Sequence, residues 1–191
     1  MRITGGEWRS RRLRGPSRGS PLRPTPDALR ERVFAVLGDR VQDARVLDLF
    51  AGSGAVGFEA LSRGARTTVF VDKHHSAIRL ISSNGSDLGV GSDRARILEL
   101  RAAEALDRLV RAGEIFDLVW ADPPFESWEE GVEAVVAAFD RGLLEAGATA
   151  CLECPAQAEV AGALPDTLRI ERDLGGGASR VVLIVRNNAD S

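Results

Sequence analysis

The tetrapeptide Asp122-Pro123-Pro124-Phe125 is the part of the sequence whose residue types point most directly to chemistry. It follows residues 116–121, an apolar run that predicts a buried strand. The Asp122 carboxylate and the Pro123 carbonyl can each accept one N–H of a planar amino group, and neither proline has an N–H to compete. Phe125 offers a face on which a base can stack. The motif therefore predicts a site for methylation of an exocyclic amino group, although Asp-Pro is also an ordinary turn signal.

A second candidate site lies where a predicted strand enters a glycine turn that is followed by a helix. Its residues from 52 to 57 also fit the dinucleotide pattern G-x-G-x-x-G, so an NAD oxidoreductase is an alternative. We favour S-adenosylmethionine, because a carboxylate inside the strand can organise the turn and the methionyl ammonium of that ligand. The chain also lacks a second domain to present a hydride acceptor. The expected contacts are Asp48, Phe50, Ala51, Gly52, Ser53 and Gly54.

The ends of the next two predicted strands add further cofactor contacts. Asp72, followed by Lys73, is placed to accept both ribose hydroxyls of an adenosine, although it could instead cap the helix that starts near His74. The segment with Ala103 and Glu104 should pass over the adenine, with contact through the Glu104 carboxylate or a backbone amide. Because ligands of open α/β sheets lie beyond the carboxyl ends of the strands, all these segments are expected to converge.

The hydrophobic pattern alternates strands and helices from residue 44 onward, which predicts a doubly wound α/β sheet with helices on both faces. The last two strands are joined by glycines without a helix and should form an antiparallel hairpin. Seven strands in this layout are typical of the class I, Rossmann-like methyltransferases. The expected strands are 44–50, 67–72, 95–99, 116–121, 148–153, 167–173 and 180–186. One helix is expected to start near residue 26, and the others are expected over 55–63, 74–88, 102–112, 128–141 and 156–163.

Length and composition set broader bounds. The chain of 191 residues suits one domain, residues 26–191, with a small hairpin and loop at 1–25. Its apolar fraction of 44% suffices for a core, no apolar run approaches the roughly 18 residues of a membrane span, and no signal peptide is evident. We expect a cytoplasmic protein. Cys151 and Cys154 are expected to be ordinary buried residues, since a zinc site would need two more ligands.

Charge is distributed unevenly along the chain. Residues 1–32 hold nine arginines and three acids, a net charge of +6, so the other residues carry −9 of the total of −3. A basic arm on an acidic body indicates contact with nucleic-acid phosphates, although an arginine-rich tail can also simply be solvated. Trp8 could stack on RNA or pin the arm to the body. The candidate RNA contacts are Arg2, Trp8, Arg9, Arg11, Arg12, Arg23, Thr25 and Arg30.

Beyond these separate signals, the chain resembles the RsmD-type 16S rRNA guanine-N2 methyltransferases over nearly its whole length. The segments that carry the resemblance are Arg2-Ile3-Thr4-Gly5-Gly6, Trp8-Arg9, Arg11, Leu22-Arg23-Pro24-Thr25-Pro26-Asp27, Arg30-Glu31, Leu47 to Gly54, Glu59 to Ala65 and Asp122 to Phe125. The arm pattern is the specific part, because many methyltransferases share the glycine loop.

The resemblance implies methylation of N2 of one guanine of 16S rRNA, guanine 966 in the family's activity, within a partly assembled 30S subunit. The cofactor would be S-adenosylmethionine, with S-adenosylhomocysteine as product and no metal. We expect a monomer that binds neither membrane nor DNA. Alternatives are amino-methylation of DNA adenine or of a protein glutamine, and a non-catalytic RNA-binding assembly factor.

Overall fold

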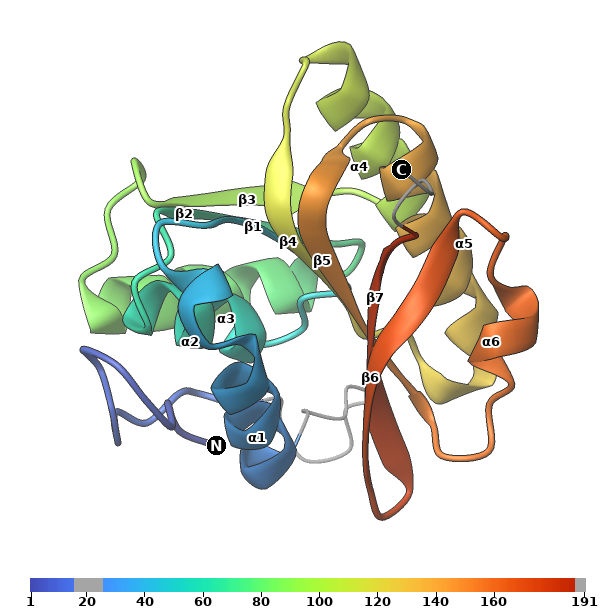
Figure 1. Ribbon diagram of the computed structural model, residues 1–191. Helices are drawn as coiled ribbons and strands as arrows, with labels where there is room; N and C mark the ends of the chain where they lie inside the picture. Colours follow the sequence, from blue (N-terminus) through green and yellow to red (C-terminus); the bar gives the residue numbers. More distant parts are fainter. Residues whose placement is uncertain (16–25, 188–191) are drawn as a thin grey trace.

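The computed structural model describes residues 1–15 and 26–187, shown in Figure 1. Residues 16–25 and 188–191 lie outside the described part of the chain. Two of the candidate RNA contacts, Arg23 and Thr25, therefore have no structural description.

A seven-stranded sheet with the order β3-β2-β1-β4-β5-β7-β6 forms the centre of the molecule. Its first five strands are parallel, while β7 runs antiparallel to both β5 and β6. This topology confirms the predicted class I methyltransferase sheet and its closing hairpin. The strands are β1 (Arg45–Leu49), β2 (Thr67–Asp72), β3 (Ala95–Glu99), β4 (Phe116–Ala121), β5 (Leu144–Pro155), β6 (Leu168–Gly176) and β7 (Ser179–Arg186).

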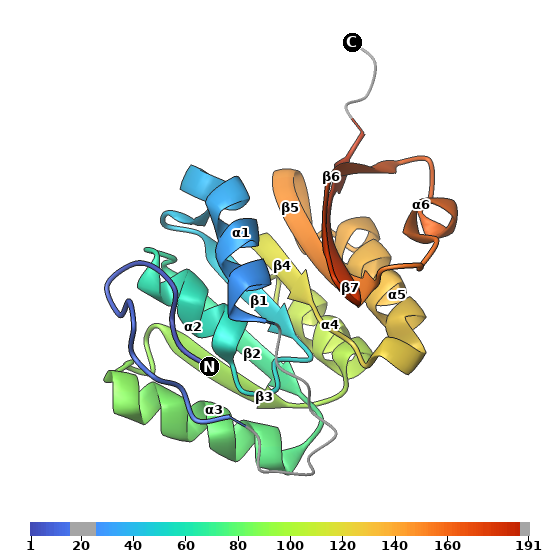
Figure 2. The same ribbon diagram turned by 90° about the horizontal axis from the view of Figure 1, so that it is seen from below.

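Helices cover both faces of the sheet (Figure 2). One hydrophobic core packs α1, α2 and α3 against the sheet, and a second packs α4, α5 and α6 against the other face. No helix within residues 1–15 or 26–187 is long and apolar enough to cross a bilayer. The helices are α1 (Asp27–Leu37), α2 (Ala55–Ser62), α3 (His75–Leu88), α4 (Ala102–Arg111), α5 (Trp128–Asp140) and α6 (Val160–Ala163), with short 3-10 turns η1 (Gly38–Val41) and η2 (Phe125–Ser127).

The largest deviations from the predicted elements lie around β5. This strand extends from Leu144 to Pro155, well beyond the expected 148–153, because a bulge and a left-handed Gly147 (φ 88°) break its alternating pattern. The helix expected over 156–163 shrinks to α6, since the Ala156 N–H still donates to Ala178 O at 3.1 Å and keeps this stretch at the sheet.

Residues 1–15, here called the N-terminal arm, fold back on themselves and pack on α2 and α3 (Figure 2). The expected hairpin is reduced to one isolated bridge between Arg2 and Arg12. A buried ion pair fastens the arm: Glu59 accepts the Thr4 N–H at 2.8 Å and the Arg30 Nε–H at 3.3 Å, and Arg30 also donates to the backbone carbonyl of Arg2. Both charged side chains are fully buried.

Replacing Glu59 by alanine should therefore destabilise the protein by about 3–5 kcal/mol, because the Arg30 guanidinium loses its fully buried carboxylate and keeps the more exposed carboxylate of Asp27 at 3.0 Å. Urea denaturation would measure the loss. Asp107→Ala is the control: it breaks a surface pair with Arg141 (2.7 Å), which should cost only about 0–1 kcal/mol. Equal losses in the two variants would contradict a structural role for the buried pair.

Candidate active site

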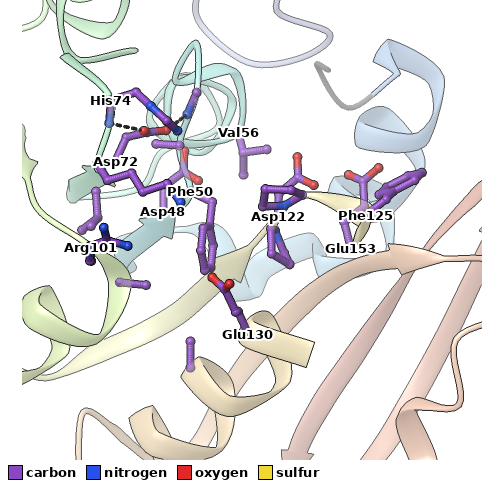
Figure 3. A pocket seen from close by; sticks show the side chains of 18 of the residues that line it. Asp48, Phe50, Val56, Asp72, His74, Arg101, Asp122, Phe125, Glu130 and Glu153 are labelled. Carbon is purple, nitrogen blue, oxygen red and sulfur yellow. Dashed lines mark hydrogen bonds between the residues drawn. The ribbon is translucent and has the colours of Figure 1, made fainter. Parts of the chain in front are cut away.

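A cavity of about 1220 Å³ opens at the carboxyl ends of β1, β2, β4 and β5 (Figure 3). It is larger than the roughly 300–1,000 Å³ of most small-molecule sites. The glycine turn after β1, the end of β2, the start of α4 and the tetrapeptide after β4 all line it, so the predicted convergence is observed. Twelve of the cavity-lining residues belong to the predicted site: Asp48, Phe50, Ala51, Gly52, Ser53, Asp72, Lys73, Ala103, Asp122, Pro123, Pro124 and Phe125.

Asp72 holds together two loops that border the cavity, the glycine turn after β1 and the segment that leads into α3. Its Oδ2 accepts the Gly52 N–H at 2.9 Å and its Oδ1 accepts the His74 N–H at 2.8 Å, drawn as dashed lines in Figure 3. The side chain is only 6% exposed. Asp72 thus caps the chain at His74, as the alternative interpretation held, and still lines the cavity with lone pairs left to accept ribose hydroxyls.

Asp48 is the most deeply buried carboxylate of the site. Its Oδ2 accepts the Gly57 N–H at 2.9 Å, which ties β1 to the first turn of α2. Burial raises the pKa of Asp48 to about 7, with the Gly57 hydrogen bond opposing the shift and the neighbouring Asp72 adding to it. A cationic group bound in the cavity would favour the ionised form.

The turn between β1 and α2 has a backbone that few residues tolerate. Phe50, Gly52 and Gly54 all have positive φ, at 61°, 54° and 76°. Gly57 is required for packing instead, because a Cβ there would lie 2.2 Å from a ring carbon of Phe70. A non-glycine residue with positive φ is uncommon, and Phe50 adopts it where its ring lines the cavity.

The tetrapeptide after β4 is held in place by its packing against α5. Pro123 is buried, and a Cβ on Gly131 of α5 would lie 2.7 Å from its ring, so the two segments are in close contact. The Asp122 N–H faces Leu49 O of β1 at 3.4 Å. Asp122 and Phe125 are partly exposed and line the cavity. The motif is thus a rigid edge of the cavity.

Glu104 does not line the cavity, in contrast to the expected adenine contact through its carboxylate. The carboxylate turns back to accept the Arg101 N–H at 3.3 Å at the start of α4, and the side chain is exposed. Helix capping therefore uses the group that the sequence assigned to the adenine. Leu100, Arg101, Ala102 and Ala103 border the cavity at this point, so a backbone contact remains a prediction.

Two of the candidate RNA contacts are corrected by the structure. Arg30 is fully buried against Glu59, so it holds the arm and has no surface to offer a phosphate. Trp8 is 7% exposed, and its backbone N–H donates to Ser62 Oγ at 2.9 Å. The Arg94 guanidinium lies 5.6 Å from the centroid of its indole ring, so Trp8 pins the arm to the body. Exposed guanidinium groups remain on Arg2, Arg9, Arg11 and Arg12.

Sequence reasoning missed two buried polar residues beside the site. Asn84 of α3 donates to Ser53 O at 2.9 Å and accepts the Arg14 N–H at 2.8 Å, so one amide joins the glycine turn to the arm. Its position in the apolar stripe of Ala77, Ile81 and Leu88 was the available signal. Glu153, 3% exposed, lines the cavity from β5, and its signal was an acid in the last position of a largely apolar predicted strand.

Residues 1–184 match the family described as conserved hypothetical protein 95. The chain belongs to this family. Ribosomal RNA small subunit methyltransferase D of Escherichia coli is 40% identical over 126 residues, 65% of this chain and 60% of that protein. The "Putative rRNA methyltransferase YlbH" of Bacillus subtilis is 34% identical over 140 residues, 73% of this chain and 74% of that protein.

Among solved structures, the "Putative methyltransferase yhhF" of Escherichia coli matches with a TM-score of 0.79 and 32% identity, over 97% of both chains. The match to the first curated relative spans under two thirds of that protein's length, whereas the structural match spans nearly the whole of both chains. Membership in the conserved hypothetical protein 95 family confirms the resemblance to RsmD-type proteins that the arm and cavity motifs indicated.

The raised pKa of Asp48 makes stability depend on pH in a defined direction. Between the ordinary value of 3.8 and about 7, the folded protein keeps a proton that the unfolded chain releases, so the free energy of unfolding should fall as pH rises across this window. Asp48→Asn cannot ionise and should lose this slope. Urea denaturation at a series of pH values from 4 to 8 should therefore show that the free energy of unfolding of the variant increases relative to that of wild type as the pH rises.

Asp117→Asn is the matched control for this experiment. The Arg45 guanidinium lowers the pKa of Asp117 below 3.8, so its contribution is constant above that value and is lost only at lower pH. The difference between this variant and wild type should not change from pH 5 to pH 8. The same flat difference for Asp48→Asn would show that Asp48 is ionised throughout.

Proposed function

We propose that this protein uses S-adenosylmethionine to methylate the N2 amino group of a guanine of 16S rRNA, guanine 966 in the resembled family, during assembly of the 30S subunit. The observation that carries the proposal is that Asp122-Pro123 faces the same cavity as Asp48 and Asp72. The names of the relatives as rRNA methyltransferases support the substrate class. We expect the protein to act as a monomer in the cytoplasm.

The cavity suits two ligands side by side. Its volume of about 1220 Å³ exceeds that of a typical single small-molecule site, roughly 300–1,000 Å³. Asp48 and Asp72 would hold the ammonium and ribose of the cofactor, and the turn with Phe50 and Gly52 would pass closely beneath it. When bound, S-adenosylmethionine supplies an electrophilic sulfonium methyl group. The wall with Asp122, Pro123 and Phe125 is left for the base.

Asp122 and Pro123 would act on the amino nitrogen of the base. The lone pair of this nitrogen is delocalised into the ring, which makes it a poor nucleophile. Two fixed acceptors for its N–H groups favour the pyramidal form and stabilise the positive charge that develops, an effect present mainly in the transition state. The new N–C bond forms as the S–C bond breaks, the electron pair passes to sulfur, and the proton leaves to Asp122 or to water.

Positioning supplies the other part of catalysis. Well-oriented reactants can recover roughly 7–11 kcal/mol of a bimolecular barrier. The close packing of Pro123 on Gly131 holds the acceptors rigid, as this requires. A base that enters the cavity must leave its stack at a cost of a few kcal/mol, and stacking on Phe125 would offset about 1–3 kcal/mol of that cost.

Asp122→Ala tests the assigned chemistry. The kcat on small-subunit particles from cells that lack the protein should fall by at least about 100-fold, the usual loss when one preorganised hydrogen-bonding group is removed. Affinity for S-adenosylmethionine, measured by calorimetry, should stay near the wild-type value because Asp122 lies on the base side. Mass spectrometry of rRNA fragments would locate the methylguanosine. Asp140→Ala, at the exposed end of α5, is the control.

Two results would count against the proposal in different ways. If wild-type protein adds no methyl group to any guanine N2 of the particles, the function is wrong. If Asp122→Ala loses cofactor affinity but turns over normally at saturation, the role of Asp122 is wrong while the function stands.

The exposed arginines of the arm should contact RNA phosphates. Replacing Arg9 and Arg12 together by alanine should weaken RNA binding and make the slope of log affinity against log salt less steep, by about 0.7 for each lost phosphate contact on a single strand. The paired variant Arg108→Ala with Arg111→Ala removes the same charge from exposed positions of α4, across the sheet from the arm (Figure 1). An equal change of slope in both pairs would refute a specific role for the arm.

A further inference from the structure

Glu153 lies beside Asp122 at the carboxyl edge of the sheet. Strands β4 and β5 run parallel in a register that pairs Trp120 with Cys151 and Ala121 with Leu152. Asp122 directly follows the end of β4, so one step further along this register it lies beside Glu153 of β5, at the roughly 4.8 Å spacing of neighbouring strands. Because side chains alternate along a strand, both point to the face that Trp120 and Cys151 occupy.

This carboxylate belongs to the base side of the cavity. Glu153 is only 3% exposed yet lines the cavity, together with Ala178 and Ser179 at the start of β7. Figure 3 shows it near Asp122 and Phe125, with Asp48 and Asp72 in the other part of the view. Glutamate is rarely buried to this extent, and a buried carboxylate on a ligand-binding wall points to recognition of a hydrogen-bond donor.

We propose that Glu153 reads the Watson–Crick edge of the target base by accepting the N1–H of guanine. This inference rests on the proposed function. Guanine presents its N1–H directly beside the N2 amino group, so a base held at N2 by Asp122 and Pro123 brings N1–H toward the adjacent strand. Flipped bases are commonly read through this edge. A purine with a bare N1 would instead place a lone pair against the carboxylate.

The same contact assists the proposed transfer. A carboxylate that accepts N1–H stabilises the positive charge that spreads over N1, C2 and N2 as the methyl group arrives, because it lies close to that charge in a site shielded from water. Glu153 thus acts as a specificity-determining residue whose effect should appear in substrate choice as well as in rate.

The test compares two kinds of small-subunit particle: one with the target guanine, located by the mass spectrometry above, and one in which ligation of the rRNA has replaced this guanine by 2-aminopurine. This base keeps the 2-amino group but has an acceptor at N1. Wild-type protein should favour guanine strongly in kcat/KM. Glu153→Gln carries both an acceptor and a donor, so it should reduce the guanine to 2-aminopurine ratio by about 10- to 100-fold, the scale of one hydrogen bond to a charged group.

Two further variants separate recognition from folding. Glu153→Asp keeps the charge and should keep the preference for guanine even if its rate falls. Glu145→Gln makes the same charge change at an exposed position of β5 and should leave both the ratio and the rate unchanged. Thermal unfolding and calorimetry with S-adenosylmethionine should give wild-type values for Glu153→Gln, and its affinity for guanine particles, measured with S-adenosylhomocysteine, should fall.

The outcomes are distinct. A wild-type ratio in Glu153→Gln, with guanine still methylated, overturns the role of Glu153 and leaves the proposed function intact. A wild-type protein that methylates no guanine N2 overturns both. Loss of the ratio in Glu153→Asp, with the wild-type ratio kept in Glu153→Gln, would show that side-chain length and not charge sets the preference, and would also overturn the recognition of N1–H by the carboxylate.

Discussion

Burial of carboxylates along one edge of the sheet is the constraint on which the rest of the site depends. Asp48 and Asp72 are almost completely buried, and a buried carboxylate is costly unless hydrogen bonds satisfy it. Backbone N–H groups of Gly52, Gly57 and His74 supply those bonds. The loops around the cavity therefore take their shape from the same acids that line it, so each acid has a structural role beside the binding role that we propose for it.

A second buried charge system joins the arm to this framework. Glu59 and Arg30 fix the arm on α2, and Asn84 links Arg14 of the arm to Ser53 of the glycine turn. The arm is therefore joined directly to the glycine turn that lines the cavity. Its polar residues divide into two groups, those that hold it to the body and the exposed arginines available to a partner.

Periodicity predicted the fold well because parallel strands buried on both faces have strong apolar runs, and β2, β3 and β4 begin and end as expected. It failed where tertiary contacts decide the outcome. The local sequence cannot show that Arg30 finds a buried partner 29 residues away, or that Glu104 caps its own helix. Glu153 was missed because one acid at the end of an apolar strand has no periodic pattern of its own.

The change of strand direction between β5 and β7 explains how the sheet forms the wall that we propose for the base. In the parallel half, carboxyl ends of strands alone meet at the cavity. Because β7 runs antiparallel to β5, its first residue, Ser179, reaches this same edge, and the hairpin turn brings Ala178 beside it. The wall opposite the glycine turn is thus built from β4, β5 and the closing hairpin, and under the proposed function it would hold the base. Substrate choice can vary there without disturbing the hydrogen bonds that hold Asp48 and Asp72.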